Sequence, residues 1–267
     1  MDFFELPINT AFIDALPADP KKEIYPRQVS GAAYSFVETK KPSKPELIHL
    51  SNAFLQDFNL QVEDKDRFLK VISGESAFPK AKAFAMCYGG HQFGNWAGQL
   101  GDGRAINIAQ LQLKSGVQTF QLKGAGMTPY SRRADGLAVL RSSIREYLCS
   151  EAMHKLGVPT TRALSIAKSG DWVLRDMLYD GNPEDEQGAI VCRVAESFIR
   201  FGSFEIFAAR NDQENLKRLT DYTIKHHFPH LGVTNKTSYL KFFEEVAERT
   251  KQMILHWQRV GFVHGVM

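Results

Sequence analysis

The stretch from Gly101 to Gly126 reads GDGRAINIAQLQLKSGVQTFQLKGAG, and its pattern decides the fold. Strand-like residues run from Ala105 to Leu111 and again from Thr119, on either side of a Ser115-Gly116 turn. Two such runs joined by a short glycine turn favour a β-hairpin. The sequence therefore predicts an antiparallel pair of strands that begins in a glycine-rich segment and ends at a lysine.

A helical pattern follows this hairpin. Apolar residues recur there at spacings of three and four, at Leu137, Leu140, Ile144, Leu148, Ala152 and Leu156. Such spacing is typical of an amphipathic helix that buries one stripe. We expect Asp135 to cap its start and Gly157 to end it, with Pro159 preventing continuation.

The rest of the chain divides into a strand-rich part and a helical part. Residues 1–45 are expected to be irregular, with Ser51 capping a short helix and a second short helix at 65–76. A second hairpin is expected with its turn at Ser169-Gly170, then a loop at 181–188 and a buried strand at 189–195. After Phe201 the pattern is helical.

This order predicts an α+β protein in which a mixed-sheet lobe precedes the first part of a helical lobe. We place the boundary between residues 1–195 and 196–267 and expect a ligand to lie between the two parts. The helix expected at 238–257 has apolar residues on more than one face, so part of it should stay exposed: Leu240, Phe242, Phe243, Val246, Met253, Ile254, Leu255 and Trp257.

Composition excludes several classes of protein. The chain has 267 residues and a net charge of +3, too small to indicate nucleic-acid binding. Its three cysteines form no C-x-x-C motif, which argues against a disulfide scaffold or a structural zinc site. No apolar run approaches the length of a membrane helix, and the N-terminus does not read as a secretory signal.

Lys123 and Glu146 are the most informative charged residues. A lone lysine at a strand end can extend to solvent, or it can point into a cleft and bind a nucleotide phosphate. Glu146 lies off the apolar stripe and needs a cation, which could be an exposed neighbour such as Arg141 or Arg145. A glycine-rich turn, a strand lysine and a helix glutamate, in this order, also form the nucleotide clamp of protein kinases. We therefore predict a Lys123–Glu146 ion pair facing the cleft.

Further basic residues lie near the junction of the two parts. Arg193 and Arg200 could pair with Glu196 or Glu205, or they could neutralise a triphosphate. The histidines at 226, 227 and 230 are better explained as a solvated helix end than as metal ligands.

Long motifs carry a family resemblance. The segments YGGHQFGNWAGQLGDGRA (88–105), FQLKGAGMTPYSRRADGLAVLRSSIREYLCSEAMHKLGVPTTRAL (120–164) and HGVM (264–267) closely resemble the selenoprotein O family. The resemblance implies a protein-kinase-like fold and transfer of AMP, rather than phosphate, from ATP to Ser, Thr or Tyr hydroxyls of proteins. It also implies Mg²⁺ or Mn²⁺ as the metal cofactor.

The resemblance assigns nucleotide contacts to eight residues: Gly101, Gly103, Arg104, Lys123, Asp135, Gly136, Arg193 and Arg200. Lys123 would hold phosphate and pair with Glu146, while Arg193 and Arg200 would grip the terminal phosphates. The family often has Arg after the Asp-Gly pair, where this chain has Leu137.

The same resemblance places the catalytic base and both metal ligands after HGVM, beyond Met267. We therefore expect this chain to hold the nucleotide clamp and to be inactive by itself. A kinase-fold phosphotransferase and a non-catalytic nucleotide- or protein-binding module remain alternatives. The family implies a cytoplasmic location in bacteria and a mitochondrial one in eukaryotes, and no transit peptide is seen here. Partners other than protein substrates are not expected, and the sequence leaves the oligomeric state open.

Overall fold

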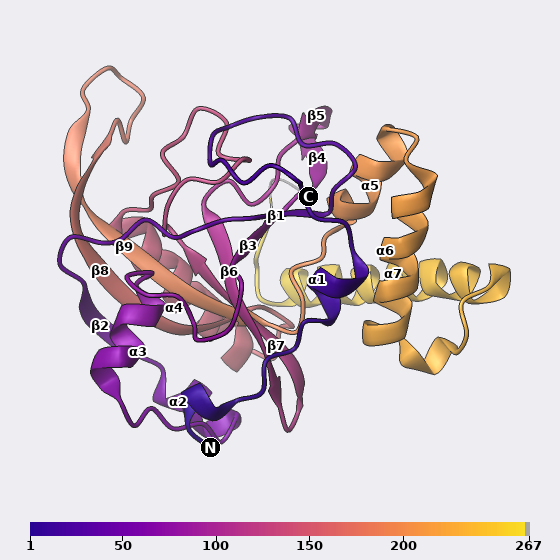
Figure 1. The fold of residues 1–267 in the computed structure, drawn as a ribbon, viewed down its shortest axis with the longest axis horizontal. Coiled ribbons are helices and arrows are strands. Elements are labelled where there is room, and N and C mark those ends of the chain that lie inside the picture. The colour runs from indigo at the N-terminus through magenta and orange to yellow at the C-terminus, as the bar shows by residue number, and fades with distance from the viewer. Residues whose placement is uncertain (265–267) are drawn as a thin grey trace.

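A computed structural model describes residues 1–264 (Figure 1). Its centre is a seven-stranded sheet in the order β1-β3-β6-β7-β9-β8-β2, and each neighbouring pair is antiparallel. The strands of this sheet are β1 Tyr34–Phe36, β2 Glu46–Leu50, β3 Phe84–Met86, β6 Ala105–Leu113, β7 Gly116–Lys123, β8 Arg162–Arg175 and β9 Glu184–Ala195. A separate two-stranded sheet joins β4 Gly89–Gln92 to β5 Asn95–Gln99.

The helices of the described residues are α1 Ala11–Ala15, α2 Asn52–Asp57, α3 Lys65–Ile72, α4 Leu140–Lys155, α5 Phe201–Ala209, α6 Gln213–His227 and α7 Lys236–Arg259, with 3₁₀ helices η1 Phe3–Glu5 and η2 Pro229–Leu231. Helices α5, α6 and α7 lie together to one side of this sheet (Figure 1). The α+β class expected from the sequence is confirmed. The β6–β7 hairpin is also confirmed, with Leu113 paired to Gly116, and Ser51 caps α2 as expected.

The second expected hairpin is wrong, because β8 is one continuous strand. It pairs with β9 on both sides of an irregularity between Lys168 and Trp172. Gly170 lies there with φ of +81°, and a Cβ on it would come within 2.6 Å of the Lys44 backbone. Ser169-Gly170 thus forms a bulge against which the N-terminal segment packs, and the chain reverses only in residues 176–183.

The two faces of the large sheet are covered differently. Apolar side chains of β6, β7 and β9, including Ile106, Phe120 and Cys192, form one core with residues of η1, α2 and α3. Phe3 lies at the centre of this core, with its ring edge-on to the rings of Phe68, Phe78 and Phe120. The N-terminal segments therefore seal this face, which we call the back face.

The opposite face, which we call the front face, carries α4 at one end and α5 and α6 at the other. Near α4 the core is small, with Tyr147 packed on Ala163, Ile166 and Val191. Near α5 and α6, Phe207 and Tyr222 pack with Phe12 and Phe84 of the N-terminal part. The core near α5 and α6 contains residues from both sides of the boundary expected after residue 195. The division into two domains stays a prediction.

Helix α4 differs from expectation in its start and in its orientation. It begins at Leu140, and Asp135 does not cap it: the carboxylate of Asp135 binds Arg175 and the Leu137 amide instead. The helix buries Ser143 and Tyr147, whereas Leu148 of the expected apolar stripe is 60% exposed. Two glutamates of α4 also reach cations on the sheet, Glu146 at Lys123 and Glu151 at Arg162, and half-buried carboxylates need such partners.

The helices after Phe201 are attached through a close backbone contact. A Cβ on Gly202 of α5 would lie 1.8 Å from the carbonyl oxygen of Gly89 in β4, so the two segments touch without side chains. Helix α7 leaves apolar side chains in solvent, as expected: Leu240, Phe243 and Leu255 are exposed. None of the helices within residues 1–264 is long and apolar enough to cross a membrane.

Candidate functional site

A row of polar side chains crosses the front face between its two cores. Asn107 on β6, Gln121 on β7 and Arg193 on β9 are direct neighbours in the strand register. Side chains alternate between the faces of a strand, so Lys123 lies on the same face as Gln121. Asn107 and Gln121 are fully buried. Buried polar groups require partners, and this row provides them for one another.

Asp102, in the turn before β6, anchors one end of this row. Its Oδ2 accepts hydrogen bonds from the amide of Met86 (3.1 Å), from Gln121 Nε2 (3.4 Å) and from Asn107 Nδ2 (3.5 Å). Burial raises the pKa of Asp102, while the charge of Arg200 and the Met86 hydrogen bond oppose that rise. Gln121 Nε2 also donates to Asn107 Oδ1 at 3.0 Å, and Gln121 Oε1 accepts from Arg193.

The other end of the row is the predicted clamp. Lys123 Nζ lies 2.7 Å from Glu146 Oε2, and Arg193 lies 3.2 Å from Glu146 Oε1. The expected Lys123–Glu146 ion pair is therefore present, and the glutamate is shared with Arg193. The alternative partner Arg141 binds Glu186 instead. Burial lowers the pKa of Lys123, and the charge of Arg193 lowers it further against the opposing effect of Glu146.

Arg200 completes the basic side of the site from the start of α5. Its guanidinium lies 5.0 Å from the ring centroid of Tyr88, and that of Arg193 lies 5.3 Å from the ring of Phe198. The positive charges of Arg200 and Arg193 both act to lower the pKa of Asp102, against the effect of its burial. Glu205, one of their expected alternative partners, lies 3.4 Å from His91. The aromatic rings hold these cations without neutralising them.

The charges of this region do not balance. The charges of Arg193 and Arg104 lower the pKa of Lys123, and Arg193 lies within the electrostatic influence of Arg200, Glu146 and Asp102. Four cations thus face two carboxylates among the described residues that act on one another here. Burial and the neighbouring positive charges lower the pKa of Arg193 against the effect of Glu146. The two cations in excess, Arg104 and Arg200, are exposed, and a site with accessible surplus positive charge is suited to an anion such as a phosphate chain.

The glycine-rich turn is shaped by Tyr130. A Cβ on Gly101, where φ is +72°, would come within 2.4 Å of the Tyr130 ring, and one on Gly103 within 2.6 Å of the Tyr130 carbonyl. Arg104 follows this turn, and its carbonyl accepts from the amide of Gly124 beside Lys123. The glycines are therefore required by packing, whereas the sequence argument invoked only open access for phosphate. Their contact with a nucleotide stays a prediction.

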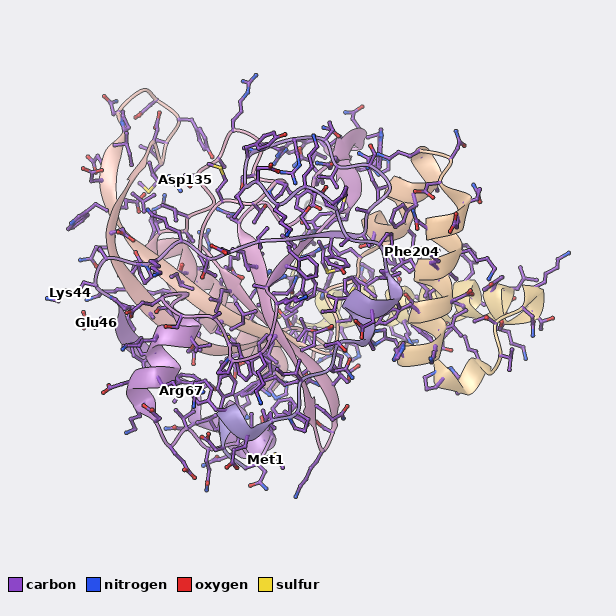
Figure 2. All side chains as sticks on the ribbon, in the orientation of Figure 1. Met1, Lys44, Glu46, Arg67, Asp135 and Phe204 are labelled. Atoms are coloured by element: carbon purple, nitrogen blue, oxygen red, sulfur yellow. The ribbon has the colours of Figure 1, made fainter. Side chains whose placement is uncertain are left out.

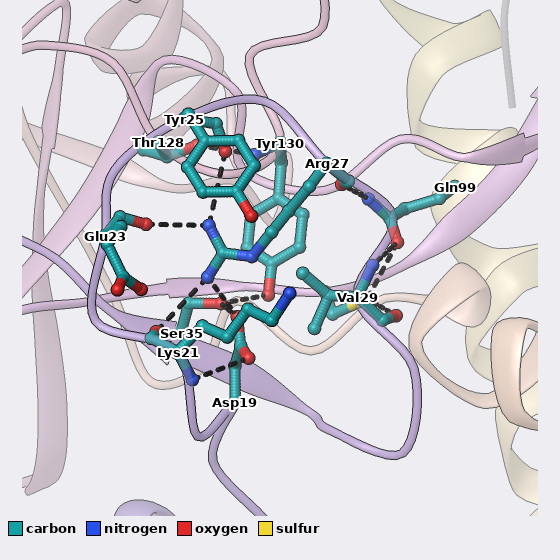
Figure 3. Close-up of polar contacts among 11 residues, drawn as sticks. Asp19, Lys21, Glu23, Tyr25, Arg27, Val29, Ser35, Gln99, Thr128 and Tyr130 are labelled. Atoms are coloured by element: carbon teal, nitrogen blue, oxygen red, sulfur yellow. Dashed lines mark hydrogen bonds and ion pairs between the residues drawn. The ribbon is translucent and has the colours of Figure 1, made fainter.

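Residues of the N-terminal segment surround the hydroxyl end of Tyr130 (Figure 3). The Tyr130 hydroxyl lies 2.9 Å from Ser35 Oγ, which donates to Asp19 at 2.9 Å. Asp19 in turn pairs with Arg27 at 2.5 Å, and both side chains are buried. The turn before β6 thus rests on residues 19–35, a segment that appeared irregular in the sequence.

Asp135 and Gly136 lie beside the clamp strand but contact other groups. Gly136, with φ of +74°, approaches Gly126 so closely that a Cβ would lie 2.1 Å from its carbonyl oxygen. The Asp135 carboxylate takes two hydrogen bonds of 2.8 Å from Arg175 on the β8–β9 hairpin. Burial opposes ionisation, but the hydrogen bonds from Arg175 outweigh it and lower the pKa of Asp135. Figure 2 shows Asp135 on the hairpin side of the sheet, far from Phe204 of α5.

The carboxylates of the site do not fit a metal ion. Mg²⁺ needs oxygen ligands free of competing cations and N–H donors. Glu146 is bound by two cations, and Asp102 accepts from three N–H groups. Residues 1–264 contain no group of three or more His, Cys, Asp or Glu placed to hold a metal. The HGVM motif, which preceded the expected ligands in the sequence argument, lies largely outside the described residues.

A sizeable pocket lies elsewhere in the described residues. It has a volume of about 700 Å³ and lies beside β1, with Phe36, Glu38, Phe78 and Lys82 among its lining residues. It contains none of the clamp residues, so the row and clamp, rather than this pocket, are the candidate site.

Sequence reasoning missed Asp102, Asn107 and Gln121. Asn107 follows Ile106 in β6 and Gln121 follows Phe120 in β7, so polar and apolar residues alternate at these two positions, whereas Asp102 precedes the strand and had no such signal. Alternation alone predicts polar residues facing water. In this protein the front face of the sheet is covered as well as the back face, so Asn107 and Gln121 are buried.

Comparison with known proteins adds a family to this geometry. The sequence model of a family described as "Protein adenylyltransferase SelO" matches residues 23–267. Proteins named "Protein nucleotidyltransferase YdiU" are similar along nearly the whole chain. That of Flavobacterium johnsoniae is 60% identical over 264 residues, which are 98% of this chain and 51% of the relative.

Two further relatives carry the same name. The protein of Azoarcus sp. (strain BH72) is 54% identical over 265 residues, covering 98% of this chain and 51% of the relative. That of Rhodopirellula baltica is 52% identical over 272 residues, covering 99% and 50%. The chain thus spans about half the length of the curated relatives it matches.

Proposed function

Because the chain belongs to the protein adenylyltransferase SelO family, we propose that its front-face site binds the triphosphate of ATP for transfer of AMP to protein hydroxyls. The observation that carries this proposal is the Lys123–Glu146 pair, which shares its glutamate with Arg193 and has the exposed Arg104 and Arg200 as further cations. Membership of a nucleotidyltransferase family makes a nucleotide the natural anion for these cations.

The residues of this chain would act by binding and orienting the nucleotide. Lys123, Arg193 and Arg200 would neutralise phosphate oxygens, and Glu146 would hold the first two in place. Gly101, Gly103 and Arg104 would line the nucleotide from the turn before β6, and Asp135 and Gly136 from the loop beyond Lys123. In the proposed reaction an acceptor Ser, Thr or Tyr oxygen attacks the α-phosphorus, and pyrophosphate leaves.

When bound, Mg²⁺ or Mn²⁺ would supply further neutralisation of the triphosphate. The carboxylates of Asp102 and Glu146 do not fit that ion, because N–H donors and cations already occupy them. We expect the 267-residue chain by itself to bind ATP without transferring AMP. The free cysteines at 87, 149 and 192 suit the reducing cytoplasm, where we place the protein.

A kinase-type phosphotransferase is the second candidate, because a lysine–glutamate clamp serves phosphoryl transfer as well. Radiolabel transfer by the longer relatives separates the two reactions. Label from the α-phosphate of ATP reaching protein supports adenylylation, and label from the γ-phosphate supports phosphorylation. For this chain, isothermal titration calorimetry with ATP is the direct test. Absence of ATP binding at millimolar nucleotide would overturn the proposal.

A further inference from the structure

We propose that Gln121 is a positioning residue that aims the Arg193 guanidinium at the terminal phosphates of the nucleotide. Gln121 lies between Arg193 and a buried polar anchor, in the middle of the front-face row. The inference rests on the proposed function, since it specifies how one phosphate-binding cation of that site is held.

The orientation of the Gln121 amide is determined by its neighbours. Its Nε2 group faces two acceptors, Asn107 Oδ1 at 3.0 Å and Asp102 Oδ2 at 3.4 Å. Asn107 is oriented in its turn, because its Nδ2 donates to the Phe84 carbonyl at 3.2 Å. A side-chain amide has its donors on one side and its acceptor on the other. Gln121 must therefore present Oε1 to Arg193.

Arg193 retains donors for a ligand. Its guanidinium carries five N–H groups, of which one bonds Gln121 and one bonds Glu146. The Nε group is buried and has no hydrogen-bond partner among the described residues. Because that atom is covered, the donors that remain for an anion are the second N–H groups of Nη1 and Nη2.

A neutral holder preserves the charge that the site needs. A carboxylate at position 121 would pair with Arg193 and cancel its charge, and it would also place a second buried anion beside Asp102. The amide of Gln121 orients the guanidinium while leaving its positive charge available. This explains why a buried glutamine, rather than an acid, occupies the position opposite Arg193.

The test compares Gln121→Met with Gln110→Met in the 267-residue chain. Gln110 is the matched control because it is a buried glutamine of the same sheet that bonds the neutral Thr119 at 3.0 Å. Dissociation constants for ATP and for AMP are measured by isothermal titration calorimetry, and thermal unfolding checks that both variants fold.

We expect Gln121→Met to weaken ATP binding about tenfold, as for loss of one charge-assisted hydrogen bond, while AMP binding changes less than twofold. Gln110→Met should bind both nucleotides like the parent chain. Equal weakening of ATP and AMP by Gln121→Met would indicate a merely structural role and overturn the inference, as would unchanged ATP binding. Failure of the parent chain to bind ATP would instead overturn the proposed function, and the inference with it.

Discussion

Helix α4 places two glutamates against the sheet, Glu146 near its middle and Glu151 in its second half, and their surroundings differ in charge. Glu151 meets one guanidinium, that of Arg162, through two hydrogen bonds of 2.9 Å, and Arg162 also binds Asp57 at 2.9 Å. Glu146 meets both Lys123 and Arg193. The contact at Glu151 thus has two carboxylates for one arginine, whereas the contact at Glu146 has two cations for one carboxylate.

This difference separates a structural contact from a binding site. At Glu151 the geometry is closed, because the carboxylate also accepts the Ala163 amide at 3.0 Å and the network joins α2, α4 and β8. At Glu146 a hydrogen-bond chain holds cations whose charge remains unbalanced. Ion pairs on one helix therefore differ in role according to the net charge around them, and the difference can be tested by mutation.

The largest effect on stability is expected at the contact between Glu151 and Arg162. Arg162→Met leaves Glu151 and Asp57 without their buried partner, and we expect a loss of about 3–5 kcal/mol in unfolding free energy. Urea denaturation followed by circular dichroism measures it. Arg218→Met is the control, because Arg218 makes an exposed pair with Glu214 and should change stability by less than about 0.5 kcal/mol. Equal losses in both variants would remove the distinction between buried and surface pairs.

At the Glu146 contact, Lys123→Met should weaken ATP binding strongly and change stability little. The fold disfavours the charge of this lysine, since burial and Arg193 lower its pKa. We expect unfolding free energy to change by less than about 1 kcal/mol, while ATP binding weakens about tenfold or more from loss of a charge-assisted contact. Calorimetric titration and urea denaturation of the same preparation give both values. A stability loss as large as that of Arg162→Met would contradict the assignment of Lys123 to ligand binding.

The smallest expected effect is on the stability of the protein at acidic pH. Burial works against the charge of Glu151, but the hydrogen bonds from Arg162 and Ala163 prevail and lower its pKa below 4.5. A lowered carboxyl pKa stabilises the fold fully above pH 4.5, and that contribution is lost as pH falls through the lowered value. The stability difference between the parent chain and Glu151→Gln should therefore shrink from pH 6 to pH 3. Parallel stability curves over this range would show that ionisation of Glu151 contributes nothing.

Much of the framework was readable from the sequence because it depends on local pattern. The β6–β7 hairpin follows from its Ser115-Gly116 turn, and the Lys123–Glu146 pair follows from the order of strand and helix. The orientation of α4 was not readable from its apolar spacing, because Tyr147 rather than Leu148 is buried against the sheet, beside glutamates that pair with strand cations.

The β8 bulge depends on Lys44, which lies more than a hundred residues away in the chain. The buried row at Asn107 and Gln121 depends on helices that cover the front face from elsewhere in the sequence. Such features are set by tertiary contacts, and alternation within a strand cannot reveal them.

The edges of the large sheet have a consequence for synthesis. Both edge strands come from the N-terminal part, since β1 pairs with β3 at one edge and β2 with β8 at the other. Leu50 at the end of β2 precedes the start of β8 at Arg162 by 112 positions (162 − 50). At typical translation speeds β2 therefore waits roughly 6–22 s on the ribosome for its partner. During that time its backbone N–H and C=O groups are open to other strands, so a nascent chain halted before residue 162 is the form of this protein most exposed to misassociation.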